Sequence, residues 1–100
     1  MIVMHASLPV QPEGREAALE LVTNLAEQSR AEDGVIDYRV TTDAEEPDTV
    51  RIFEQYEDDE AVDAHMSSDH FQAFQGEIGA HLAGEPTLLR FDAESSTQLM

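Results

Sequence analysis

The sequence predicts an α+β domain in which a four-stranded antiparallel sheet carries its helices on one face. Two observations support this prediction. The chain has 100 residues, which is enough for a single domain with one core but not for two. Its apolar residues switch between strand spacing and helix spacing in the order β-α-β-β-α-β, with turn residues between the segments.

The first strand and the first helix are expected within residues 1–34. Residues 1–10 are rich in Ile, Val, Met and Leu and end around two prolines, which predicts a strand closed by a turn. From Glu13 onward, apolar residues recur at helical spacings of three and four: Ala18, Leu21, Val22, Leu25 and Ala26. We expect Gly34 to end this helix in a left-handed conformation. The pattern does not assign His5 to either face of the first strand.

Two further strands are expected after Gly34. Val35–Thr42 alternates polar residues with three apolar ones, as a half-buried strand does: Ile36, Tyr38 and Val40. The polar run 42–48 predicts a turn, and Thr49–Tyr56 predicts a third strand of similar length. Tyr38 and Phe53 are therefore expected in neighbouring antiparallel strands.

The second helical region is expected to be broken in two. Asp58 is placed to cap its first part, because a short carboxylate accepts hydrogen bonds from the free amides of a helix start. The run Ser67–Asp69 predicts a break and a second cap. Four apolar residues then form one helical stripe: Phe71, Phe74, Ile78 and Leu82. Gly84 and Pro86 predict the end of this helix.

A last strand is expected at Thr87–Phe91. Residues 93–100 lack periodicity, which predicts a mobile tail after a domain of residues 1–92. The complete order of elements is that of the split βαβ, or ferredoxin-like, arrangement. A sheet covered on one face leaves the other face open, and burying that face against a second copy predicts a homodimer.

The composition excludes several kinds of partner. The chain has 22 acidic residues against 5 arginines and no lysine, for a net charge of −17. Such a surface repels phosphate backbones and anionic lipids, so neither nucleic acid nor a membrane is expected as a partner. Adaptation of a halophile to high salt explains this acidity. No apolar run suits a membrane span or a signal peptide, so the expected location is cytoplasmic.

Several strings carry a resemblance to a known family. Phe53–His65, followed by Ser68–Phe71, resembles the signature of the antibiotic biosynthesis monooxygenase (ABM) superfamily: a Glu two residues before an aromatic residue, an acidic helix cap, an Ala-His pair and a Ser-x-His-Phe step. Val10–Glu16 resembles the first turn of the family, and Glu32–Gly34 resembles the end of its first helix. The similarity covers about residues 1–92.

This resemblance implies a ferredoxin-like protomer that pairs through its sheet into a dimeric α/β barrel. It also implies a quinol monooxygenase-like activity, in which a hydroquinone or phenolic small molecule is oxidised by O2 without a cofactor. Two alternatives stay open: a dimeric small-molecule-binding or stress-response module without turnover, and an isomerase of a small phosphorylated carbonyl compound. The haem-degrading branch is disfavoured, because the position of its iron-binding His is Gln75 in this sequence.

Oxygenation without a cofactor calls for a base, an apolar pocket that excludes water, and hydrogen-bond donors. His65 suits the base, because an unperturbed histidine has a pKa of about 6.5 and the helical spacing places it on the inward face with Ala61 and Val62. The competing interpretation is a core histidine bonded to a neighbour. Tyr56 is the second candidate catalytic residue, as a pocket wall and hydroxyl donor, against simple core packing.

The candidate substrate-binding residues are Glu54, His70, Phe71 and Phe74. Glu54 shares a strand face with Tyr56, and we expect it either to pair with Arg39 or Arg90 or to lie at a solvated rim.

A metal site is tested by residue spacing. His65 and Asp69 are four residues apart, which could bring both to one ion on a continuous helix, but the expected break between them argues against it. No metal site is therefore predicted.

Overall fold

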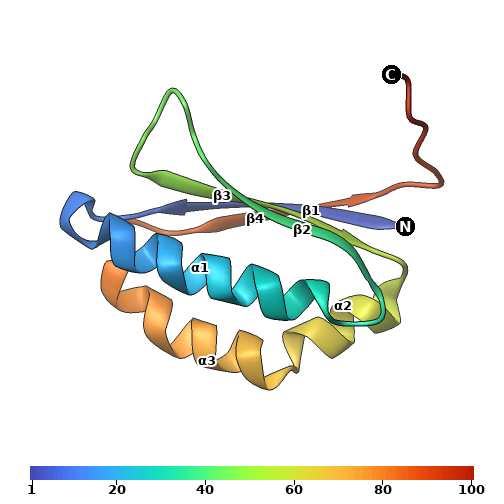
Figure 1. Cartoon of the computed structure of the whole chain (residues 1–100), viewed down its shortest axis with the longest axis horizontal. Helices are drawn as coiled ribbons and strands as arrows, with labels where there is room; N and C mark the ends of the chain where they lie inside the picture. Colours follow the sequence, from blue (N-terminus) through green and yellow to red (C-terminus); the bar gives the residue numbers. More distant parts are fainter.

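The computed structural model describes residues 1–100. Its four strands form one antiparallel sheet in the order β2-β3-β1-β4, with β1 and β3 in the centre. Figure 1 shows this sheet as one layer above the helices. The strands are β1 at Ile2–Pro9, β2 at Val35–Thr42, β3 at Thr49–Tyr56 and β4 at Thr87–Asp92. This sheet and the element order confirm the predicted ferredoxin-like class.

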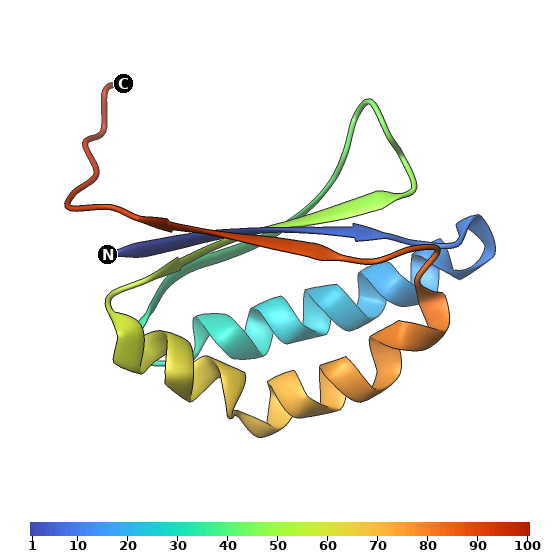
Figure 2. The ribbon, with the colours of Figure 1, turned by 180° about the vertical axis from the view of Figure 1, so that it is seen from behind.

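Three α-helices cover one face of the sheet, as Figures 1 and 2 show from opposite sides. They are α1 at Arg15–Arg30, α2 at Asp59–Met66 and α3 at Asp69–Ile78, with short 3-10 turns η1 at Pro12–Gly14 and η2 at Gly79–His81. Both predicted caps are present. Asp58 Oδ1 accepts from the amide of Ala61 at 2.9 Å, and Ser68 Oγ accepts from the amide of Phe71 at 3.3 Å. None of the helices combines the length and apolarity that a membrane span requires.

The core lies between the helices and the inner face of the sheet. On β1 every second residue is buried, so Ile2, Met4, Ala6 and Leu8 point inward while His5 lies on the outer face. β3 behaves in the same way from Val50 to Tyr56. From α1 the residues Ala18, Val22, Leu25 and Ala26 pack against this face, which matches the predicted helical stripe.

Gly34 corrects one prediction. Helix α1 ends at Arg30, and no glycine in the chain has a positive φ, so the expected left-handed stop is wrong. A Cβ added at Gly34 would instead lie 2.3 Å from the Cβ of Ala61. The position needs glycine because α2 passes close to the chain there, not because the backbone is left-handed.

Two apolar side chains also differ from the expected pattern. The pairing of β2 with β3 shifts between Val35 and Asp37, and this bulge leaves Ile36 half-exposed instead of facing inward with Tyr38. Helix α3 ends at Ile78, so Leu82 lies beyond the helix and its η2 extension, where it pairs with Val10.

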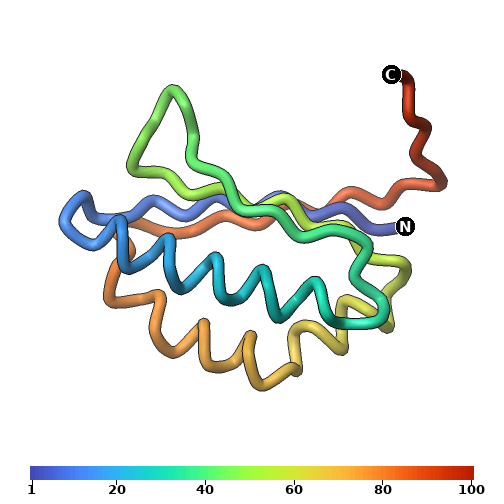
Figure 3. The backbone as a smooth tube through the Cα atoms, in the orientation of Figure 1, coloured from blue at the N-terminus to red at the C-terminus, as the bar shows by residue number.

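The outer face of the sheet is uncovered. It exposes Phe53, Leu89 and Phe91, which are 39%, 56% and 53% accessible. Residues 93–100 form no helix or strand and turn away from the sheet (Figure 3). Their first amide, on Ala93, bonds the carbonyl of Met1 at 2.9 Å.

Candidate functional site

A cavity of about 200 Å³ lies between the inner face of the sheet and α3. Nine of its 13 lining residues are hydrophobic, among them Ala6, Leu8, Ile52, Phe71, Phe74 and Ile78. Exposed residues on the lining, Gln75, Thr87 and Leu88, mark its opening to solvent. Glu54 is the only carboxyl group in the lining, so the cavity is an apolar space with one acid.

Glu54 is buried in the protein, with only 4% of its surface accessible. Its Oε1 accepts a hydrogen bond of 2.5 Å from the hydroxyl of Tyr56, which is the one hydrogen bond of this carboxyl group. Burial raises the pKa of Glu54 to about 7, and the hydrogen bond from Tyr56 partly opposes this rise. The carboxyl group can therefore both take up and release a proton near neutral pH.

The expected surroundings of Glu54 are wrong on two counts. The residue does not lie at a solvated rim, and neither predicted arginine reaches it. Arg39 pairs with Asp37, and Arg90 pairs with Asp59 and Asp92. The residue that donates a hydrogen bond to the carboxylate is Tyr56, which lies two positions along the same strand and on the same face.

Two tyrosines flank the acid. Tyr56 and Tyr38 are 0% and 1% accessible, and burial followed by the charge of Glu54 raises the pKa of both phenols. Both therefore stay protonated, and the hydroxyl of Tyr56 donates a hydrogen bond to Glu54. Tyr38 lines the cavity, whereas Tyr56 reaches it only through its bond to Glu54.

His65 does not line the cavity, but its ring packs against two aromatic residues that do. Its side chain is fully buried, and its ring centroid lies 5.3 Å from that of Tyr38 and 4.9 Å from that of Phe71, two residues of the cavity wall. Nδ1 lies 2.8 Å from Oε2 of Glu32. Burial lowers the pKa of His65, and the hydrogen bond and charge of Glu32 oppose this.

His70 also bonds Glu32, and it does not line this cavity. Its Nε2 lies 2.7 Å from the same Oε2 atom that His65 contacts. Glu32 was not among the predicted site residues, because it is 33 positions from His65 and 38 from His70. The signal in the sequence was its place in the Glu32–Gly34 string, which we assigned only to the end of the first helix.

The ligand atoms of Glu32, His65 and His70 lie within 4.8 Å of one another, so these three residues form the one cluster that could hold a metal ion. The pair considered from spacing, His65 with Asp69, is not part of it. Of the predicted substrate-binding residues, Glu54, Phe71 and Phe74 line the cavity together.

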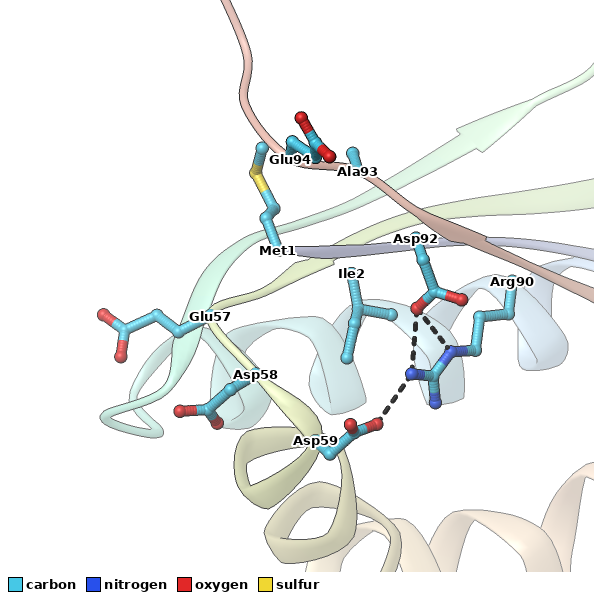
Figure 4. Close-up of a pocket in the computed structure, with 9 residues that line it drawn as sticks. All are labelled: Met1, Ile2, Glu57, Asp58, Asp59, Arg90, Asp92, Ala93 and Glu94. Atoms are coloured by element: carbon cyan, nitrogen blue, oxygen red, sulfur yellow. Dashed lines mark hydrogen bonds and ion pairs between the residues drawn. The ribbon is translucent and has the colours of Figure 1, made fainter.

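A second hollow lies at the start of β1 and α2 (Figure 4). It is lined mainly by acidic residues around Arg90, whose guanidinium lies 2.6 Å from Asp59 and 2.9 Å from Asp92. Both of these carboxylates point toward the arginine in Figure 4. The charge of Arg90 is thus already balanced, and no arginine lines the apolar cavity. Neither hollow offers the free cation that a phosphate group requires.

Comparisons with known proteins show which family the chain resembles. Residues 1–77 match the family model for antibiotic biosynthesis monooxygenase. A Bacillus subtilis (strain 168) protein named "Putative monooxygenase YcnE" is 36% identical over 74 residues, which are 74% of this chain and 78% of that protein.

Solved structures show the same fold. A crystal structure from Caulobacter crescentus CB15, described as a putative antibiotic biosynthesis monooxygenase, has a TM-score of 0.90 at 27% identity and covers 94% of this chain and 90% of its own. A structure from Deinococcus radiodurans has a TM-score of 0.91 at 21% identity and covers 100% and 99% of the two chains. At that identity the likeness concerns the fold alone.

Proposed function

Because the chain belongs to the antibiotic biosynthesis monooxygenase family, we propose that it oxidises a hydroquinone or another phenolic small molecule with O2 and without a cofactor. One observation carries this proposal: a single carboxyl group, Glu54, faces an otherwise apolar cavity and is held by the hydroxyl of Tyr56. A phenol becomes a strong electron donor when it loses its proton, so an acceptor in a water-poor cavity is what the reaction needs.

In this proposal Glu54 takes the phenolic proton through Oε2. The resulting phenolate donates electrons to O2, and a ring C–H is replaced by a C=O bond. One oxygen atom enters the product, and the other leaves as water with the phenolic proton and the ring proton. A phenol with a free para position and one O2 thus give a para-quinone and one water, and a hydroquinone and one O2 give a hydroxylated para-quinone and one water. Tyr56 stabilises the ionised Glu54 by its hydrogen bond and so adjusts the basicity of the carboxylate.

The size and charge of the cavity favour a small neutral aromatic substrate. A volume of about 200 Å³ suits a single ring with short substituents, and the walls are mostly apolar. A phosphorylated substrate of an isomerase would meet Glu54 and no arginine in this cavity. The like charges of phosphate and carboxylate make that alternative the weaker one.

The same proposal includes a homodimer formed through the outer face of the sheet. Phe53 lies there on β3, and Leu89 and Phe91 lie on β4, the two strands on either side of β1, and all three are exposed in the single chain. Apolar side chains gathered in this way mark an interface. A second copy that presents the same face would cover them and produce the α/β barrel expected from the family resemblance.

The test is oxygen uptake with a panel of substituted hydroquinones and phenols, measured against autoxidation. We expect one O2 consumed per quinone formed, and a kcat about 100-fold lower in Glu54→Gln, which removes the base but keeps an acceptor for Tyr56. Glu57→Gln, an exposed neighbour on the same chain segment, is the matched control and should leave kcat unchanged.

Three outcomes contradict the proposal in distinguishable ways. No uptake above autoxidation with any compound refutes the oxygenase. A substrate converted equally well under argon indicates an isomerase. A compound that binds stoichiometrically and is recovered unaltered in air indicates a binding module.

A further inference from the structure

Glu32, His65 and His70 form a cluster that has no part in the proton transfer described above. Its members come from three segments: Glu32 follows α1, His65 belongs to α2 and His70 lies in the first turn of α3. One ligand atom of each residue lies within 4.8 Å of the other two. Both imidazoles reach Oε2 of Glu32, at 2.8 Å from Nδ1 of His65 and 2.7 Å from Nε2 of His70. Spacing alone predicts no metal site, because it pairs His65 with Asp69 and does not reveal the contact with Glu32.

The carboxylate of Glu32 lacks a permanently charged partner. Its side chain is 17% accessible, and its only ion-pair partners are the two histidines. The arginines that form ion pairs do so with other carboxylates. The net charge of −17 also attracts cations to the whole surface. A positive ion held by Glu32 would therefore neutralise a largely buried carboxylate in an already acidic protein.

The hydrogen bonds of His65 are incomplete. Its Nε2 is buried and has no hydrogen-bond partner. If a neutral ring donates from Nδ1 to Glu32, Nε2 is left with an unmet lone pair. The neighbouring aromatic rings, whose faces are negative, do not stabilise a lone pair: those of Tyr38, Tyr56 and Phe71 lie at centroid distances of 5.3, 5.6 and 4.9 Å. If Nδ1 instead binds a metal ion, Nε2 carries the proton, and an N–H among aromatic rings makes a weak favourable contact.

The donor atoms indicate the kind of ion. Two imidazole nitrogens and one carboxylate oxygen suit Zn²⁺, which can complete a tetrahedron with a water molecule, whereas Mg²⁺ and Ca²⁺ prefer oxygen donors. Around zinc at bond lengths of about 2.1 Å, the donor atoms lie roughly 3.4 Å apart. The N–O contacts of 2.8 and 2.7 Å would therefore widen by about 0.6 Å. The side chains of Glu32 and His70 are 17% and 18% accessible, so they have room for this shift and leave a side open to water.

We propose that Glu32, His65 and His70 bind one Zn²⁺ ion, which ties the segment after α1 to the junction of α2 and α3. Its role is structural, because zinc has no redox chemistry and none of its three ligands lines the apolar cavity. The two histidines directly precede Met66 and Phe71, which do line the cavity, so the ion holds that wall in place. This inference does not depend on the proposed oxidation.

The binding test is calorimetric titration with Zn²⁺ after treatment with EDTA, in about 0.5 M NaCl to screen the acidic surface. Wild-type protein is expected to bind one ion per chain. His70→Ala should weaken binding about 100-fold or more, because one of three protein ligands is lost. His81→Gln, which alters a histidine outside the cluster, is the control and should bind as the wild type does. Absence of a one-to-one site in the wild type, or equal affinities in the two variants, overturns the proposal.

Co²⁺ in place of Zn²⁺ tests the coordination. We expect the visible absorption of four-coordinate Co²⁺ in the wild type, since geometry distinguishes such a site from loosely held surface ions. Glu32→Gln removes the charged ligand and should abolish this spectrum, whereas the exposed neighbour Asp33→Asn should keep it. A Co²⁺ spectrum that survives in Glu32→Gln would place the ion at other residues and refute the assignment.

The structural role has a separate test in thermal unfolding. At Zn²⁺ concentrations about 100 times the dissociation constant, the Tm of the wild type should rise by about 10 °C, and EDTA should reverse the rise. His70→Ala should still fold, because its side chain is at the partly exposed edge of the cluster, but its Tm should not respond to Zn²⁺. A wild-type Tm that Zn²⁺ leaves unchanged would contradict an ion that joins three segments.

Discussion

Two adjacent residues of β3 lie on opposite faces of the sheet, and each is on the face where the other type of side chain is expected. Phe53 points to the open outer face and is 39% accessible, whereas Glu54 points to the helix-covered inner face and is 4% accessible. An ordinary two-layer domain would bury the phenylalanine and expose the acid. An exposed phenylalanine and a buried acid both cost free energy in the single chain. A ligand or a second copy of the chain that contacts them would reduce that cost.

The contrast between Phe53 and Glu54 indicates which molecule each face of the sheet binds. The inner face is closed by helices, so a buried carboxyl group there has a raised pKa and faces only a small cavity. The outer face carries Phe53 and Leu89 on either side of His5, together with polar residues such as Arg51 and Gln55. We assign the first face to a small ligand and the second to another copy of the chain.

The largest effect is expected on the outer face. Replacing Leu89 and Phe91 by Thr should raise the dissociation constant of the dimer at least about a thousandfold, because burial of each such side chain contributes about 1.5–3 kcal/mol and two copies lose them together. Sedimentation over a dilution series measures this change.

The monomer itself should keep its fold, since both side chains are more than half exposed in the single chain. Leu99→Thr, an apolar residue of the C-terminal segment that is 88% accessible, is the control and should leave association unchanged. A wild-type protein that stays monomeric at high concentration would refute the interface.

A smaller effect is expected from the buried acid, as a pH dependence of stability. The pKa of Glu54 is raised from 4.5 to about 7 in the folded state, so the folded chain holds this proton more tightly than the unfolded chain does. The stability contributed by the protonated group is complete below about pH 4.5 and is lost as the pH rises to about 7, a difference of about 3 kcal/mol.

Glu54→Gln cannot titrate and should therefore gain about 3 kcal/mol relative to the wild type between pH 4.5 and 7.5, measured by urea unfolding. Comparing the two proteins at each pH cancels the titration of the other 21 acidic groups. A stability difference that stays constant across this range would mean that the pKa of Glu54 is the same in the folded and the unfolded chain. That result contradicts a buried carboxyl group.

The sequence was informative where a local pattern determines the structure. The alternation in Thr49–Tyr56 predicted the strand with its correct bounds and placed Glu54 and Tyr56 on one face. The caps at Asp58 and Ser68 were predictable because they depend on amides only three residues away. The resemblance carried by Phe53–Phe71 identified the family, which the match over residues 1–77 confirms.

The sequence was uninformative where distant residues meet. Glu32 reaches His65 and His70 across more than 30 positions, and no periodicity indicates that contact. The partner of Glu54 was wrongly sought among arginines because a buried acid was assumed to need a cation, whereas a tyrosine hydroxyl and a raised pKa suffice. The bulge beside Ile36 likewise depends on the partner strand.

The smallest of the three effects concerns the closure of the inner face. Gly34 lies against Ala61 at the start of α2, and an added Cβ would lie 2.3 Å from the Cβ of Ala61 and 3.2 Å from its Cα. Gly34→Ala should therefore push α2 away from the sheet and destabilise the fold by about 2 kcal/mol.

Gly76 in α3 has nothing within 4 Å of such a Cβ, so Gly76→Ala should stabilise the fold by up to about 1 kcal/mol. Thermal and urea unfolding of the two variants should therefore shift in opposite directions. Equal effects would show that α2 can move without loss, and the inner face would then be less firmly closed than the burial of Glu54 requires.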